Sequence, residues 1–189
     1  METLMRATGV LMKEHRAIEV MLRVLEAISS RAEADEPLEQ EDLDAIVEFL
    51  QVFADKCHHG KEEDLLFPAM EAAGIPREGG PIGVMLAEHS EGRNIVKRLA
   101  AAVDGYKAKR GGAAAEIASA ARDYVRLLSQ HIQKEDGILY PMANARMSGD
   151  KEAELVEAFK EVERERIGPG KHEEFHALLH RLESVYLRG

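Results

Sequence analysis

One stretch of sequence occurs twice, and this duplication constrains the fold more than any other feature. His58-His-Gly-Lys-Glu-Glu-Asp-Leu-Leu-Phe-Pro68 aligns without gaps with His131-Ile-Gln-Lys-Glu-Asp-Gly-Ile-Leu-Tyr-Pro141, 73 positions later. Upstream, Glu14-His15 corresponds to Glu88-His89, 74 positions later. Each half therefore contains a helix with one Glu-His pair, followed by a helix that ends in His-x-x-Lys-Glu. We expect the two hairpins to pack about a pseudo-two-fold axis.

Apolar residues recur with a helical period along nearly the whole chain, and strand-like alternation is almost absent. The pattern predicts long helices over about 4–31, 41–73, 82–109 and 113–147, with a local rearrangement at Pro68. An acidic linker (33–39), a Gly- and Pro-rich loop (74–81) and Gly111-Gly112 separate them. Two shorter helices follow, one opening at 148–150 and one running from 168–170 to near Arg188. We predict an all-α fold: an antiparallel up-down-up-down four-helix bundle with two C-terminal helices packed on it.

Composition sets the class of protein. The 189 residues suit a single domain, 1–189, made of a four-helix bundle (1–147) and a C-terminal helical extension (148–189). A net charge of −10 argues against nucleic-acid binding, which depends on Lys and Arg neutralising phosphates. The single cysteine, Cys57, favours a reducing compartment, and no apolar run approaches the ~20 residues of a membrane helix. We therefore expect a soluble, cytoplasmic protein that does not bind membranes.

Helical periodicity directs four histidines toward the interior of the predicted bundle. His15, for example, continues the apolar stripe of Leu11 and Ile18. A Glu lies one turn after two of these histidines and therefore shares their helix face. Burying such groups without a cation is costly, whereas His and carboxylate ligands on facing helices suit a di-iron or di-manganese site. The predicted metal ligands are His15, His58, Glu62, His89, His131 and Glu135.

Two ligand positions have competitors. His59 has the same spacing to Glu63 as His58 has to Glu62, but Asp55 and Gln51 place it on a polar face, and the repeat has Ile132 in its place. We therefore predict His58 as the ligand. Asp136 could replace Glu135 or support the site from outside.

Other polar and aromatic residues are given structural or outer roles. Glu14, Glu88, Lys61 and Lys134 are predicted to be solvated or to lie just outside the ligands. The spaced histidines of the last helix are predicted at its surface: His172, His176 and His180. Cys57 is predicted as a small buried side chain, and three tyrosines as packing residues: Tyr106, Tyr124 and Tyr140.

These motifs resemble the hemerythrin-like family, the HHE cation-binding domains. The resemblance covers about residues 4–147 and rests on Glu14-His15, His58 to Pro68, Ala87-Glu-His89 and His131-Ile-Gln-Lys-Glu135. It implies an antiparallel four-helix bundle with a non-haem di-iron centre, bridged by two glutamates and an oxo or hydroxo group. The ligands it implies are the same six. The oxygen carriers of this family have a second histidine one turn after the third-helix ligand, where this chain has Arg93.

The resemblance and the motifs together favour a metal-binding or sensing protein over a dedicated enzyme. We expect two iron ions, although manganese or zinc accepts the same ligands, and a small diatomic ligand or peroxide as the partner. The alternatives are a di-iron oxidoreductase (ferroxidase, peroxide- or nitric-oxide-consuming, or iron-centre repair) and a metal-stabilised interaction module. The two extra helices also suggest a homodimer. Motifs of hydrolases, kinases and dinucleotide-dependent enzymes are absent from the sequence.

Overall fold

The computed structural model describes residues 6–188, which are helical almost throughout and contain no strand. The long helical stretches begin with α1 (Ala7–Glu33), α2 (Gln40–Phe49), α4 (Pro81–Lys107) and α5 (Ala113–Lys134), and those of α2 and α5 continue without a break to residues 72 and 146. The predicted all-α class is confirmed for this part of the chain. The predicted start of the first helix, at residue 4, lies outside the described residues.

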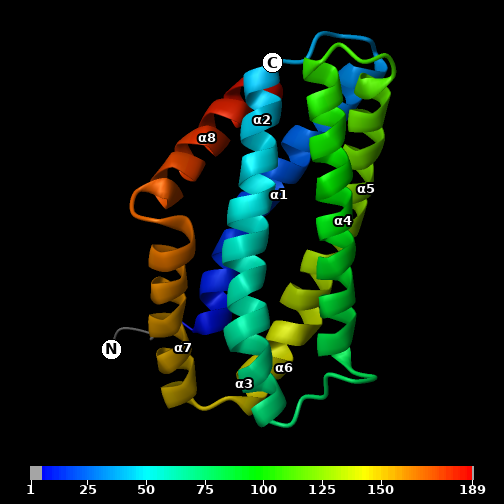
Figure 1. Ribbon diagram of the computed structural model, residues 1–189. Coiled ribbons are helices and arrows are strands. Elements are labelled where there is room, and N and C mark those ends of the chain that lie inside the picture. The colour runs from blue at the N-terminus through cyan, green and yellow to red at the C-terminus, as the bar shows by residue number, and fades with distance from the viewer. Residues whose placement is uncertain (1–5, 189) are drawn as a thin grey trace.

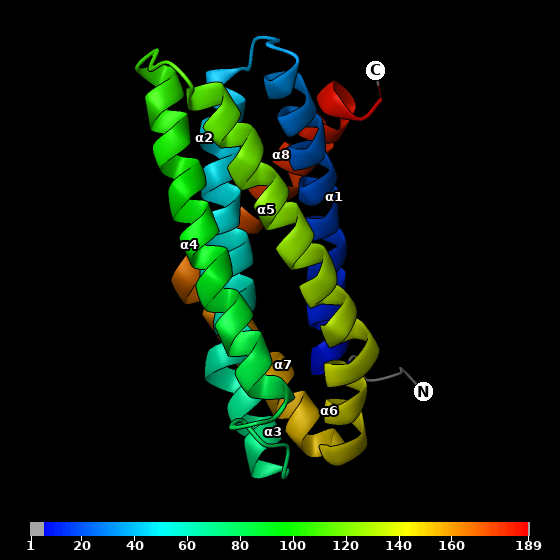
Figure 2. The ribbon, with the colours of Figure 1, turned by 90° about the vertical axis from the view of Figure 1, so that its right-hand side faces the viewer.

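The long helices lie side by side along the length of the molecule (Figure 1). The links from α1 to α2 and from α4 to α5 lie at one end, and the loop that precedes α4 lies at the other (Figure 1). α5 packs against both α1 and α4, and α4 also contacts α2. A view turned by 90° shows α4 and α5 in front of α1 and α2 (Figure 2). The result is a helical bundle whose interior receives side chains from every long helix.

Several segments have the wider π-helical turn, in which hydrogen bonds join residues i and i+5. These segments are η1 (Leu50–His59), η2 (Glu62–Leu66), η3 (Glu135–Leu139) and η4 (Glu163–Ile167). η2 and η3 occupy equivalent places in the repeat, and each directly precedes a short helix with proline near its start, α3 (Phe67–Ala72) or α6 (Tyr140–Arg146). Proline has no N–H and clashes with the carbonyl four residues earlier, so a wider turn accommodates it. The rearrangement predicted at Pro68 takes this form.

The C-terminal extension consists of α7 (Gly149–Val162), η4 and α8 (Lys171–Tyr186). α7 contacts α1 and η2, while α8 contacts α1 and α2. Phe159 of α7 and Phe175 of α8 are both buried against the rest of the molecule. At the start of α1, the backbone N–H of Ala7 donates to Glu152 Oε2 at 2.8 Å. The extension is thus packed on the other helices, as predicted.

Buried apolar side chains form two clusters with a polar layer between them. Along α1, Leu11 belongs to one cluster and Ile18 to the other, and His15 lies between them. Along α4, Met85 and Ile95 belong to different clusters on either side of His89. The apolar contacts above and below therefore fix the level at which the histidines meet. No helix within residues 6–188 is long and apolar enough to cross a membrane.

Candidate metal centre

The six predicted ligands converge at this polar layer, and each is at most 1% exposed. They reach it from six different elements: α1, η1, η2, α4, α5 and η3. The potential ligand atoms in this layer, which include those of His59, form two groups that share Glu62. Within each group the atoms lie within 4.8 Å of one another. One group consists of His15, His58, Glu62 and Glu135, and the other of His59, Glu62, His89 and His131.

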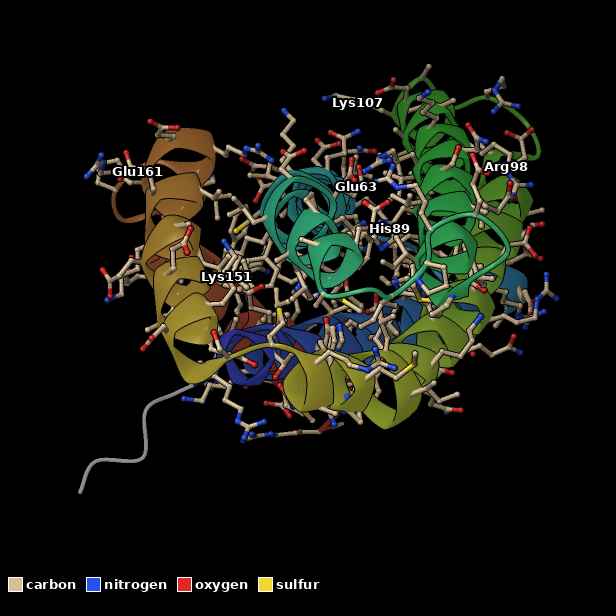
Figure 3. The ribbon with its side chains drawn as sticks, turned by 90° about the horizontal axis from the view of Figure 1, so that it is seen from below. Glu63, His89, Arg98, Lys107, Lys151 and Glu161 are labelled. Atoms are coloured by element: carbon tan, nitrogen blue, oxygen red, sulfur yellow. The ribbon has the colours of Figure 1, made fainter. Side chains whose placement is uncertain are left out.

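Each of the four predicted histidines donates its Nδ1–H to a carboxylate. His58 donates to Glu14 and His131 to Glu88, both at 2.9 Å, which repeats one contact in the two halves. His15 donates to Asp136 at 2.7 Å and His89 to Glu63 at 2.8 Å, which repeats another. Glu63 and His89 face each other across the gap between η2 and α4 (Figure 3). A carboxylate at Nδ1 fixes the ring and directs Nε2 toward the centre, as at metal-binding histidines.

Several buried atoms of the side chains around the centre lack a hydrogen-bond partner. They are His58 Nε2, both ring nitrogens of His59, Glu62 Oε2 and both carboxylate oxygens of Glu135. The Nε2 atoms of His89 and His131 lie within hydrogen-bond distance of each other, 3.1 Å apart. A buried polar atom left without a partner costs about 1–3 kcal/mol. Cations bound by those atoms that face the centre would remove that cost, so the residues fit a metal site.

The two glutamates disfavour each other's charge. Burial, together with the nearby charge of Glu62, raises the pKa of Glu135 to about 8. Burial opposes ionisation of Glu62 as well, but His58 and His89 outweigh it and hold the pKa of that carboxyl well below its usual range. Two carboxylates this close do not both ionise readily unless a cation lies between them. The pair is therefore suited to bridging positive charge.

Lys61 completes the surroundings of His58. Its ammonium group is fully buried and donates to both Glu14 and Glu163. Burial alone would raise the pKa of Glu14, but its contacts with His58 and Lys61 lower that pKa. Lys134, the equivalent residue, donates to Glu88 but is 36% exposed. These residues were predicted either to be solvated or to lie just outside the ligands. Glu14 and Lys61 are buried just outside the ligands.

The prediction that His59 lies on a polar face is wrong. His59 is only 3% exposed, and its ring stacks on that of His89 with centroids 3.9 Å apart. The prediction counted faces with the α-helical period, but η1 (Leu50–His59) is π-helical and turns by a smaller angle per residue. Adjacent His58 and His59 therefore both face the interior. The sequence carries no pattern that marks a π-helical segment of this length.

Tyr140 is packed in the core, as predicted, but the prediction missed the contacts of its hydroxyl group. Its hydroxyl donates to Glu62 Oε1 at 2.7 Å and lies 3.3 Å from His15 Nε2. In the other half of the repeat, Phe67 has no hydroxyl, and its ring stacks near His89 instead. Tyr140 therefore belongs to the site on one side of the centre only.

The predictions missed Glu63 and left Asp136 open. Glu63 could have been found from its place in the repeat, since it corresponds to Asp136 and each orients one histidine. Asp136 supports His15 through Nδ1 and does not belong to the two groups of potential ligand atoms.

Arg93 lies outside the ligands, beside a cavity. Its guanidinium donates to Asp55 Oδ1 at 2.8 Å and to Glu63 Oε1 at 2.7 Å. A cavity of about 200 Å³ opens next to it, with Gly92 and His59 among its lining residues. The cavity therefore reaches His59, although none of the six predicted ligands lines it.

The remaining residues singled out in the sequence lie away from the ligands. His176 and His180 are exposed, as predicted, and half-buried His172 packs near Phe53. Cys57 is buried as predicted, and burial raises the pKa of its thiol to about 12.

The fold and the site define a class: a helical-bundle protein with a buried His and Glu cluster compatible with a metal site. The profile of the hemerythrin HHE cation-binding domain matches residues 6–143. The chain belongs to this family.

Curated relatives add little about function. An uncharacterized protein of Mycobacterium bovis is 26% identical over 158 residues, which cover 84% of this chain and 61% of that protein. Uncharacterized proteins of two Mycobacterium tuberculosis strains match to the same extent. This chain thus spans about three-fifths of the length of these relatives. No solved structure matches the chain significantly.

Proposed function

We propose that this protein is a non-haem di-iron protein of the hemerythrin-like type. It binds or senses dioxygen, nitric oxide or peroxide, or handles iron in stress defence, in an antiparallel four-helix bundle. The observation that carries the proposal is the convergence of buried nitrogen and oxygen atoms without hydrogen-bond partners at one level of the bundle. Family membership supports cation binding independently.

The proposed ligands divide between two metal positions. His15 and His58 would hold one ion and His89 and His131 the other. Glu62 and Glu135 would lie between the ions, since each has oxygens near histidines of both pairs. When bound, two iron ions joined by an oxo or hydroxo group supply redox electrons and open coordination positions. Manganese and zinc accept the same donor types, so the choice of iron rests on the family.

The chain's own groups prepare the site for this chemistry. Carboxylates at Nδ1 hold the imidazoles in the orientation that binding requires, which limits reorganisation when a metal binds. Tyr140 donates a hydrogen bond to Glu62 and so holds one carboxylate oxygen in place. The apolar clusters on both sides exclude water from the layer.

A di-iron oxidoreductase is the second candidate function. The cavity beside His59 supports it, because that cavity gives a small reactant a place next to the centre. Repeated consumption of peroxide or nitric oxide by the iron-loaded protein would support the oxidoreductase. Stoichiometric binding without turnover would support the binding or sensing protein.

Elemental analysis with an optical spectrum, after expression in iron-replete medium, tests the proposal. We expect about two irons per chain and near-ultraviolet absorption of an oxo bridge. Glu135→Gln should lose both, whereas His180→Gln, at an exposed position of α8, should lose neither. A wild-type protein that holds one zinc ion, or no metal, would refute the di-iron proposal.

A further inference from the structure

His59 is a buried imidazole whose interactions with the protein do not satisfy it. Neither ring nitrogen has a hydrogen-bond partner, although the side chain is almost completely buried. Its ring stacks on His89, and its centroid lies 5.7 Å from that of His131. A histidine that serves only for packing usually hydrogen-bonds at least one nitrogen. His59 therefore requires another partner in the direction of His89 and His131.

The orientation of the ring resembles that of the other histidines. Asp55 Oδ1 lies 3.5 Å from His59 Nδ1, without a hydrogen bond, so a carboxylate again lies on the Nδ1 side. Arg93 holds this carboxylate through a hydrogen bond of 2.8 Å. Nε2, on the opposite side of the ring, belongs with the potential ligand atoms of Glu62, His89 and His131.

The duplication of the chain supplies an internal comparison. The residue equivalent to His59 is Ile132, an apolar side chain that is 2% exposed. Ile132 lies in α5, which keeps α-helical hydrogen bonds until Lys134, whereas the first half is π-helical from Leu50. Only the half with the additional π-helical turns thus has a histidine at this position. Short π-helical segments occur frequently at functional sites.

We propose that His59 is a fifth imidazole ligand, bound to the same metal position as His89 and His131. The inference rests on the proposed two-metal function and deepens it. The two metal positions are then unequal: one receives three imidazoles, and the other receives two, from His15 and His58. The π-helical segment η1 is the structural cause, because it turns His58 and His59 inward toward different positions.

Cobalt(II) binding to protein stripped of metal with a chelator tests this assignment. In protein labelled with 15N-histidine, metal-bound imidazoles are identified by ring signals that the paramagnetic ion shifts strongly. We expect such shifts for five of the eight histidines of the wild type. Four shifted rings, with His59 at its ordinary position, would overturn the inference, and this measurement does not depend on the folding of any variant.

The variant His59→Gln provides the second readout, with His176→Gln, at an exposed position, as the matched control. Chelator competition should show that His59→Gln still binds one cobalt ion with wild-type affinity but binds the other at least about tenfold more weakly. The control should bind both ions normally. Equal affinities in wild type and His59→Gln would overturn the inference and leave the proposed function intact. A wild type that binds fewer than two ions would instead overturn the proposed function.

Discussion

Removal of the hydrogen bond from Tyr140 to Glu62 should destabilise the protein, and more so without metal than with it. Tyr140→Phe keeps the ring and removes only the hydroxyl, which donates to Glu62 Oε1 at 2.7 Å inside a fully buried site. A hydrogen bond to a charged group contributes about 1.5–3 kcal/mol. For a chain of this size, a loss of about 2 kcal/mol lowers the melting temperature by roughly 4–8 °C. We expect this decrease in protein stripped of metal with a chelator.

Metal should reduce the effect, because a cation bound to Glu62 stabilises the carboxylate charge that Tyr140 otherwise stabilises. We therefore expect the decrease in melting temperature to fall by at least half in the metal-loaded protein. Circular dichroism melts of both forms measure it. Tyr124→Phe is the matched control, since Tyr124 is also buried but is not hydrogen-bonded to Glu62. Equal decreases for the two variants in the stripped protein would refute the reasoning.

Three further predictions concern the surroundings of the centre. Lys61→Met should destabilise the protein by about 3–5 kcal/mol in urea unfolding, because it removes the ammonium partner of the buried Glu14 carboxylate. Lys134→Met, at a more exposed pair, should cost about 1 kcal/mol or less. Cys57 should resist a thiol reagent at pH 8 in the native protein and react fully in urea, since burial raises its pKa to about 12; rapid reaction of the native protein would contradict its burial. Gly92→Ala should slow azide binding to the loaded protein without changing its metal content, because Gly92 lines the cavity and a Cβ atom there meets its neighbours at ordinary contact distances of 3.7–3.9 Å. An unchanged rate in stopped-flow absorbance would show that azide enters elsewhere.

The duplication made much of the site predictable from sequence. His15 and His89, and likewise His58 and His131, support each other as pairs, since an inward histidine in one half has a counterpart in the other. All four are buried at one level of the bundle, although their metal ligation remains a prediction. Helix boundaries were also close, because glycine, proline and acidic segments separate the helices.

The features that the sequence did not reveal are those that break the repeat or the α-helical period. His59 has no histidine counterpart, and its inward orientation depends on π-helical hydrogen bonds, which apolar periodicity does not report. The hydroxyl of Tyr140 has no counterpart in Phe67, so a comparison of the halves favours packing for both. Patterns of residue type indicate which face of a helix is apolar. They do not indicate which buried hydroxyl finds which carboxylate.

The contact between Lys61 and Glu163 joins the family-matched part of the chain to the C-terminal extension. The family match ends at residue 143, yet Glu163 shares with Glu14 the ammonium group beside His58. A chain shortened to the matched region would keep Glu14 and Lys61 but remove Glu163, and so change the electric field at His58. The residues that match the family are thus fewer than the residues whose charges surround His58. A change at Glu163 in the C-terminal extension can therefore alter the charge around His58 without a change in any predicted ligand.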